Sequence, residues 1–163
     1  MMRTLNPEHM KIIVDLVNKG YYYALLDMDV EELGAGYSRV RVPVSEKHWN
    51  SFGGIHGGAM ASILDTAAYW AAYGMMEEGV GYTTLDLNVN CLRSVGGGSI
   101  LAEGRVIKAG RSIFLAESQI KDDQDRLIAT AQSKLFLAPA IQPIEKALEI
   151  YMPDVVLPPK FLD

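Results

Sequence analysis

A glycine-rich stretch that runs into a long apolar segment is the feature that most restricts how this chain can fold. The stretch Gly53-Gly54-Ile55-His56-Gly57-Gly58 leads into residues 59–76, where Asp65 is the only formally charged residue. The alanines favour a helix, and apolar residues lie nearly all the way round it, which predicts a buried helix. An ionised carboxylate in an apolar environment costs several kcal/mol unless it is compensated or its pKa rises. Asp65 therefore needs a structural or chemical reason to be there.

A membrane span is the alternative to a buried helix, because the apolar run reaches the minimum length for crossing a bilayer. The run is single, short and rich in alanine, however, and Asp65 lies near its middle. Charged residues are costly at that depth. We therefore expect a buried helix and no membrane segment.

The distance along this helix predicts a dimer. If the helix begins near Gly57, Asp65 lies about 12 Å further along the axis. Unpaired N–H groups in the first turn can polarise a carbonyl oxygen, but an acid must come within roughly 3–3.5 Å of the reacting carbon. An antiparallel second helix, crossing near Ala61, would place Gly57 of one chain beside Asp65 of the other. We therefore expect a symmetric dimer with two shared sites.

Composition restricts the class of protein. With 163 residues, 49% of them hydrophobic, the chain is expected to form one domain with a proper core. Its net charge of −5 argues against general binding of nucleic acids, which requires a basic face. A single cysteine, Cys91, excludes an internal disulfide, and the N-terminus lacks the apolar core of a signal peptide. We therefore expect a cytoplasmic protein.

The order of predicted elements gives the fold class. Asn6, Pro7 and Gly20 are typical of the start and end of a short amphipathic helix. Strand character follows over the ranges 21–30 and 37–44, and after the long helix over 82–95, 99–108, 112–121 and 127–137. Short links imply antiparallel neighbours. We expect an α+β domain over residues 1–138, in which an antiparallel sheet wraps around one long central helix.

The remaining residues, 139–163, contain several prolines, and only 144–151 have helical character. This tail is expected to lie over the domain or over a neighbouring subunit, or to be partly disordered.

The motif around the helix start resembles the hotdog-fold acyl-CoA thioesterases, and within them the PaaI-like (phenylacetate-pathway) group. The matching positions are Asn50, Gly53, the run His56-Gly57-Gly58, and Asp65. The resemblance covers roughly residues 20–138 and extends to the run 84–90 after the helix. Cys91 and Ser94 stand where the group would have an aromatic residue and a proline, which affects the expected shape of the acyl pocket.

The resemblance implies a role for each matching residue. The Gly57 N–H would polarise the thioester carbonyl, and Asp65 of the partner chain would be the nucleophile or the general base for water. Asn50 would orient the carbonyl or the water, and Thr84 would place the water beside Asp65. His56 is expected to be a hydrogen-bonding residue at the helix cap rather than a base, because no acid at short fixed spacing orients it.

Further residues are candidates for binding the substrate. Gly58 belongs to the same helix start. Three cations, Arg93, Lys108 and Arg111, would bind the phosphate groups of coenzyme A, or they are simply solvated residues at strand ends. Coenzyme A would then be part of the substrate, with no separate cofactor. The three histidines are scattered over different environments, so no metal site is expected. Tyr69, Trp70 and Tyr73 are expected mainly in the core, but those on the Asp65 face could line an acyl tunnel.

Three functions are open at this point. The first is hydrolysis of an acyl-CoA thioester, the second is non-catalytic binding of acyl-CoA, and the third is a hotdog hydratase or dehydratase. The third ranks last because His56 and Asp65 are not spaced for proton transfer on an acyl chain. The acyl group, the choice between a dimer and a dimer of dimers, and the exact role of Asp65 stay open.

Overall fold

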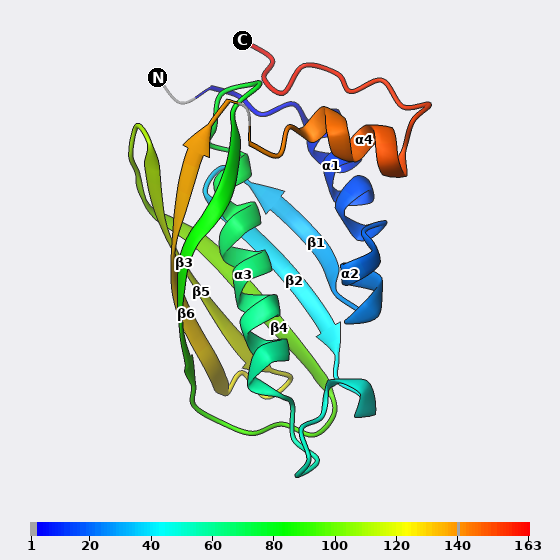
Figure 1. The fold of residues 1–163 in the computed structure, drawn as a ribbon, viewed down its shortest axis with the longest axis vertical. Coiled ribbons are helices and arrows are strands. Elements are labelled where there is room, and N and C mark those ends of the chain that lie inside the picture. Colours follow the sequence, from blue (N-terminus) through cyan, green and yellow to red (C-terminus); the bar gives the residue numbers. More distant parts are fainter. Residues whose placement is uncertain (1–2, 140) are drawn as a thin grey trace.

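Six strands form one sheet that curves around a single long helix in the computed structural model, which describes residues 3–139 and 141–163 (Figure 1). In chain order the elements are α1 (Pro7–Asn18), α2 (Tyr21–Leu25), β1 (Asp29–Gly34), β2 (Tyr37–Pro43), the short 3-10 helix η1 (Glu46–His48), α3 (Gly57–Tyr73), β3 (Gly81–Cys91), β4 (Ser99–Ala109), β5 (Ile113–Asp122), β6 (Leu127–Ala138) and α4 (Ile144–Tyr151).

The strands pair in the order β1-β2-β4-β5-β6-β3, and every pair is antiparallel. Along β5 the side chains alternate between the concave face, where Phe114, Ala116 and Ile120 are buried, and the outer face. This confirms the predicted α+β arrangement of an antiparallel sheet around a central helix, with a short helix before it.

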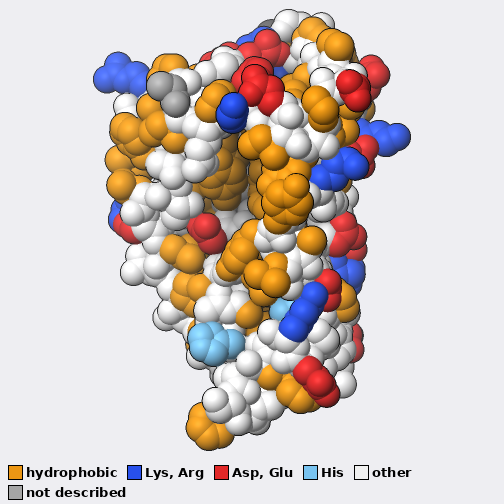
Figure 2. Space-filling model, turned by 45° about the vertical axis from the view of Figure 1, so that its right-hand side comes forward, with side chains coloured by type: hydrophobic (Ala, Val, Ile, Leu, Met, Phe, Trp, Pro, Cys, Tyr) orange, Lys and Arg blue, Asp and Glu red, His pale blue; other side chains and the backbone are white. Residues whose placement is uncertain are grey.

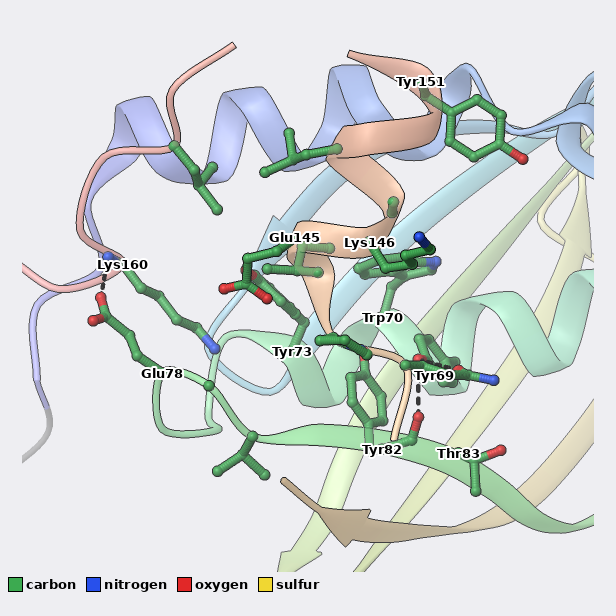
Figure 3. Close-up of a pocket in the computed structure, with 18 of the residues that line it drawn as sticks. Tyr69, Trp70, Tyr73, Glu78, Tyr82, Thr83, Glu145, Lys146, Tyr151 and Lys160 are labelled. Carbon is green, nitrogen blue, oxygen red and sulfur yellow. Dashed lines mark hydrogen bonds between the residues drawn. The ribbon is translucent and has the colours of Figure 1, made fainter. Parts of the chain in front are cut away.

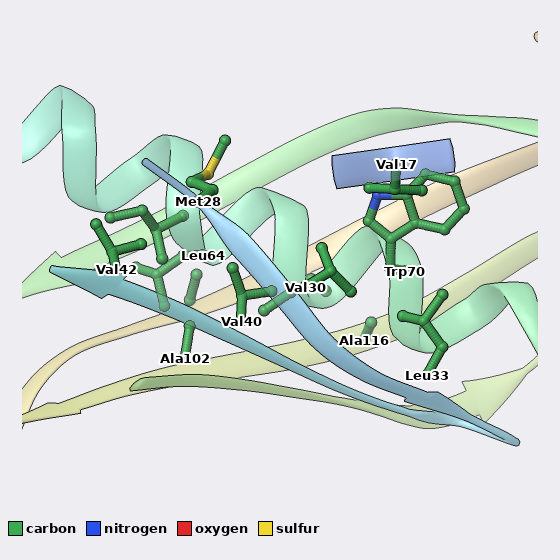
Figure 4. Close-up of a cluster of buried hydrophobic side chains, with 14 of the residues drawn as sticks. Val17, Met28, Val30, Leu33, Val40, Val42, Leu64, Trp70, Ala102 and Ala116 are labelled. Atoms are coloured by element: carbon green, nitrogen blue, oxygen red, sulfur yellow. The ribbon is translucent and has the colours of Figure 1, made fainter. Parts of the chain in front are cut away.

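The core lies between α3 and the concave face of the sheet. Valines of β1 and β2 and alanines of β4 and β5 pack towards Leu64 of α3 (Figure 4). Small residues permit this close approach, since a Cβ at Gly104 would lie 2.0 Å from the Ala67 carbonyl oxygen. Two buried hydroxyls add hydrogen bonds to helix carbonyls: Ser38 Oγ donates to Ala67 at 2.6 Å, and Ser118 Oγ to Leu64 at 2.8 Å.

The prediction of a strand over residues 21–30 is wrong for its first half. Residues Tyr21–Leu25 form α2, and β1 begins only at Asp29. Tyr21 and Leu25 are exposed, whereas Tyr23 is anchored by a 2.7 Å hydrogen bond from Trp70 Nε1. One anchored residue per turn suits a short helix, while a strand would need alternate residues buried.

The central helix also ends earlier than the apolar run suggests. Gly74 follows its last residue, and a Cβ there would lie 2.2 Å from the carbonyl oxygen of Gly34. The β1–β2 turn therefore passes directly over the end of α3, and only glycine leaves room for it. The strand predicted over 82–95 likewise ends at Cys91.

The C-terminal tail lies over its own domain, which is one of the arrangements that the sequence left open. Leu148 of α4 is buried in the core cluster, and Lys160 is only 3% exposed. The two ends of the chain lie side by side (Figure 1), since Asn6 N donates to Lys160 O at 2.8 Å and Leu162 N to Thr4 O at 3.0 Å. The division of the chain into a domain over residues 1–138 and a tail over 139–163 stays a prediction. Among the described residues, no helix is long and apolar enough to cross a membrane.

Candidate active site

The N-terminus of α3 is capped by a histidine, as the sequence predicts. His56 Nδ1 accepts a 2.8 Å hydrogen bond from Gly58 N, so this ring nitrogen carries no proton in the cap. A Cβ at Gly58 would lie 3.0 Å from that nitrogen, and the glycine leaves room for the ring. Within the described residues, no group accepts a hydrogen bond from Gly57 N–H. The first turn therefore presents a free donor at the positive end of the helix dipole.

Asn50 organises the loop that leads into this helix. Its Oδ1 accepts hydrogen bonds from Phe52 N at 2.8 Å and from Gly54 N at 3.4 Å. Gly53 has a φ of 79°, which allows the chain to turn back so that Asn50 N reaches the Gly54 carbonyl at 2.7 Å. Because the carboxamide oxygen of Asn50 is engaged in the loop, its NH₂ group is the part left to act on a substrate.

Asp65 lies two turns further along α3, on the side of the helix next to the edge strand β3. It is partly buried, and Thr84 Oγ1 of β3 donates to its Oδ1 at 2.9 Å. Burial raises the pKa of the Asp65 carboxyl, and the hydrogen bond from Thr84 opposes that rise. No Lys, Arg or His in the described part of the chain forms an ion pair with it. Thr84, which the sequence analysis expects to place a water beside Asp65, thus lies next to Asp65 within one chain.

Asp65 and Thr84 open into a cavity with a volume of about 1360 Å³. Hydrophobic side chains border a hollow on this face of the molecule (Figure 2). The close-up shows aromatic rings converging from α3, β3 and α4 (Figure 3). The cavity is lined by Tyr69, Trp70 and Tyr73 of α3, Tyr82 of β3 and Tyr151 of α4, and also by Tyr22 and Tyr23 of α2. The site therefore combines the Asp65 carboxylate with a chamber rich in aromatic side chains, which is also lined by Glu77, Glu78, Glu145, Lys146 and Lys160.

Comparison with known proteins identifies the family. The model of the thioesterase superfamily matches residues 52–129, which include the helix start, Asp65 and Thr84. The proofreading thioesterase EntH of Klebsiella pneumoniae is 31% identical over 100 residues, which span 61% of this chain and 73% of EntH. The chain belongs to the thioesterase superfamily.

Solved structures establish the hotdog fold of this thioesterase. A thioesterase from Haemophilus influenzae superposes with a TM-score of 0.76 at 22% identity, over 87% of this chain and 99% of that one. A hypothetical thioesterase protein from Streptococcus pneumoniae, solved with coenzyme A, has a TM-score of 0.67 at 18% identity, over 76% and 94% of the two chains. The predicted hotdog thioester hydrolase is confirmed.

One thioesterase chain does not bring all the predicted site residues together. Arg93 follows β3, and its N–H donates to Ile128 O. Two residues further on, Val95 O accepts a hydrogen bond from Ile55 N, which lies just before α3, so Arg93 is near the start of that helix. Lys108 and Arg111 lie at the β4–β5 hairpin, at the opposite end of the sheet. Gly57 does not line the cavity that contains Asp65. The residues therefore divide into three groups, with Asn50, His56, Gly57, Gly58 and Arg93 near the start of α3, Asp65 and Thr84 near its middle, and Lys108 and Arg111 at the β4–β5 hairpin.

Sequence reasoning missed part of the chamber wall of this thioesterase. Tyr23 reaches the cavity from α2, and α4 contributes residues such as Ala147 and Tyr151. The helical character of 144–151 was visible, but nothing in the sequence indicated that this helix covers the face of Asp65. Among the residues that can be described, no cluster of His, Cys, Asp and Glu is suited to hold a metal ion.

Proposed function

We propose that this thioesterase hydrolyses acyl-CoA thioesters and that Asp65 activates the water or attacks the carbonyl carbon. The observation that carries the proposal is a partly buried carboxylate in a chamber of about 1360 Å³. Among the described residues it has one hydrogen bond, from Thr84, and no ion-pair partner. A carboxyl group whose pKa is raised by burial is a better base near neutral pH than an ordinary aspartate. Coenzyme A enters only as part of the substrate, with no separate cofactor.

The contact with Thr84 suggests how water is held. Thr84 Oγ1 donates its hydrogen to Asp65 Oδ1, so its lone pairs are free to accept a hydrogen bond from a water molecule. That water could pass a proton to Asp65 Oδ2 while its oxygen attacks the thioester carbon and the coenzyme A thiolate leaves. In the nucleophilic alternative, Asp65 attacks the thioester carbon and the C–S bond breaks, so that the coenzyme A thiolate leaves and a mixed anhydride forms. Water then cleaves the anhydride to the free acid and the Asp65 carboxylate.

The proposed oxyanion site requires a second subunit. Gly57 and Asp65 of one chain are separated by about 12 Å along α3, too far to act on one carbonyl. Between them α3 carries the partly exposed Ala61 and Ser62, and Tyr22 Oη of α2 lies 2.7 Å from Ser62 Oγ. The two small side chains of α3 favour close approach of an antiparallel partner helix, which would bring Gly57 and the Asn50 NH₂ group to Asp65 of the other chain.

The edges of the sheet support the same two-fold pairing. Strand β3 forms one edge and has eleven residues, with Leu85 57% exposed. The other edge, β1, is covered by α1, and the side chain of Asn18 both accepts from Val30 N and donates to Val30 O. An unpaired edge strand favours pairing with another chain. We therefore propose a homodimer joined at β3, while a dimer of dimers stays open.

Coenzyme A would be held by cations from both subunits. Antiparallel pairing would bring the end of one chain that carries Arg93 towards the end of its partner that carries Lys108 and Arg111. All three side chains belong to exposed residues, and none forms an ion pair with another described residue. The coenzyme A bound in the Streptococcus pneumoniae protein supports this class of ligand.

A thiol-release assay tests the proposed chemistry. Wild type is assayed with short, medium, long and aromatic acyl-CoAs beside Asp65→Asn, with Asp123→Asn as an exposed control. We expect wild type and the control to release thiol, and Asp65→Asn to lower kcat by at least about 10². An unchanged rate would exclude Asp65. No release by a folded wild type would favour the non-catalytic acyl-CoA binder.

Mixed dimers test whether the sites are shared. Gly57→Pro removes the N–H at the first helical position, where proline is tolerated, and the preceding backbone is already extended. Gly57→Pro and Asp65→Asn should each be inactive alone. In a mixed dimer one of the two shared sites keeps both groups. Because random pairing makes about half of the dimers mixed, mixing should restore about a quarter of wild-type activity. Sites confined to single chains would stay inactive.

The hydratase alternative has less support from the geometry. His56 uses Nδ1 in the helix cap and does not line the cavity that contains Asp65. Within one chain, the described histidines are therefore not beside Asp65, since His9 lies at the far end of the cavity. In the proposed dimer the partner's His56 would approach Asp65 together with Gly57, but its Nδ1 is engaged in the helix cap.

A further inference from the structure

The C-terminal segment, residues 141–163, forms one side of the Asp65 cavity although it lies outside the family match at 52–129. Helix α4 lies over the C-terminal half of α3, with the chamber between them (Figure 3). Its inner side chains face the aromatic wall made by Tyr69, Trp70 and Tyr73. Those that line the cavity include Ile144, Ala147, Leu148 and Tyr151.

The segment is fixed where it begins. A Cβ at Gly81 would lie 1.4 Å from the Ile141 carbonyl oxygen, so the chain crosses β3 at a point where only glycine fits. Tyr69 Oη lies 3.0 Å from Gln142 Oε1 and 3.1 Å from Tyr82 O, so its single hydrogen can be donated to either acceptor. The start of the segment is therefore tied both to β3 and to the chamber wall.

The segment is also fixed at its far end. Lys160 Nζ donates to Met76 O at 2.8 Å and lies 4.0 Å from the centre of the Tyr73 ring. The Lys160 backbone N–H donates to the Glu78 carboxylate, and the ring of His9 joins Pro158 O to Tyr73 Oη with two 2.7 Å hydrogen bonds. With both ends held, α4 has the contacts of a fixed wall rather than of a loose tail.

We propose that residues 141–163 set the size of the acyl group, with Ala147 and Ile144 as the residues that determine specificity. This inference rests on the proposed function, which places the thioester at Asp65. From there an acyl chain runs along α3 beneath α4 towards Tyr73, which lies eight residues on, or about 12 Å. Tyr73 and Lys160 close that end. Acyl groups that fit within this depth are accepted, and longer fatty chains are excluded.

Binding of non-hydrolysable thioethers tests the wall without turnover. S-alkyl-CoA thioethers from ethyl to hexadecyl are titrated calorimetrically into wild type, Ala147→Phe and Ile144→Ala. Ala147→Phe adds a ring to the half-buried inner side of α4, while Glu149→Phe adds the same ring to its exposed side and serves as the matched control. We expect Ala147→Phe to weaken the longest thioether that wild type binds by at least about tenfold and to leave the ethyl thioether unchanged.

The second variant changes the chamber in the opposite direction. Ile144→Ala enlarges it and should move the preferred chain length upwards. If Ala147→Phe does not fold, as judged by melting beside Glu149→Phe, this shift alone decides the proposal. Equal effects on the binding of all chain lengths, or no effect on any, would overturn the proposal that residues 141–163 set the size of the acyl group. Loss of thiol release in wild type would overturn the proposed hydrolysis instead, because the titrations do not depend on it.

Discussion

Two aspartates of this thioesterase have little contact with water but opposite surroundings. At the β5–β6 turn, Asp122 accepts hydrogen bonds from Gln124 N at 3.0 Å, Arg126 N at 2.9 Å and Arg126 Nε at 2.7 Å. The bond from Arg126 holds the pKa of that carboxyl below its usual range. On α3, Asp65 accepts a single hydrogen bond from Thr84, and burial raises its pKa.

The difference agrees with a structural role for Asp122 and with the chemical role proposed for Asp65. Each partner of Asp122 stabilises its charged form, and together they hold a tight turn. Asp65 is left under-compensated beside a chamber, which is unfavourable for folding but favourable for a group that must take up a proton or form a bond. The thioesterase therefore gives up some stability at Asp65.

Paired substitutions should show this difference most strongly. Asp65→Asn should lower kcat by at least about 10² while the protein melts at the same temperature or higher at pH 7, because an under-compensated charge is removed. Asp122→Asn should keep kcat and melt several degrees lower, because the ion pair with Arg126 is lost. Kinetics and thermal melts of both variants check this. A large drop in the melting temperature of Asp65→Asn would contradict it.

Lys160 extends the comparison to a buried cation. It is 3% exposed, and burial lowers its pKa from 10.5 to about 8. Between these values the unfolded chain binds the proton and the folded chain does not, so the free energy of unfolding should rise by about 2–3 kcal/mol from pH 7 to pH 10. Urea unfolding at both pH values measures this rise. The rise should disappear in Lys160→Met, and an equal rise in both proteins would refute the assignment.

Removing the one hydrogen bond to Asp65 should have a smaller effect. Thr84 lowers the pKa of Asp65, so Thr84→Val should raise that pKa further and move the acidic limb of kcat/KM to higher pH. The rate at pH 7 should fall about tenfold. Thr83→Val is the matched control, since Thr83 lines the same cavity without a bond to Asp65. A pH profile that shifts equally in both variants would argue against the role of Thr84.

The smallest effect is expected for Arg93→Ala. If this exposed guanidinium meets coenzyme A phosphate, KM should rise about threefold to tenfold and kcat should stay the same. The difference should shrink at high salt. Arg105→Ala serves as control, because Arg105 is already paired with Glu117. A salt-independent loss of kcat would indicate a structural role for Arg93.

The central helix and the long strands were predictable because their patterns are local. The apolar run around Asp65 and the alternation in β5 each report burial directly. The contact between Asp65 and Thr84 could be anticipated only through the family motif, since residues 19 apart in sequence have no spacing rule. The role of His56 followed from its place before the helix.

The parts that escaped prediction depend on distant contacts. Tyr21 to Leu25 resembles a strand in composition, and the anchor that makes it helical is Trp70, 47 residues from Tyr23. The position of α4 depends on Gly81 and on the bonds of Lys160, which a pattern within 144–151 does not contain. Tertiary contacts of this kind override local propensity.

The carboxamide of Asn18 has a consequence for how the molecule avoids aggregation. By bonding to both backbone groups of Val30, it occupies the outer edge of β1 and denies that position to another strand. The free edge of the described sheet is then β3, and the proposed two-fold contact there would use up that edge in both chains. In the proposed dimer, assembly through backbone pairing would end with the second copy, which would oppose growth of the sheet into a fibre.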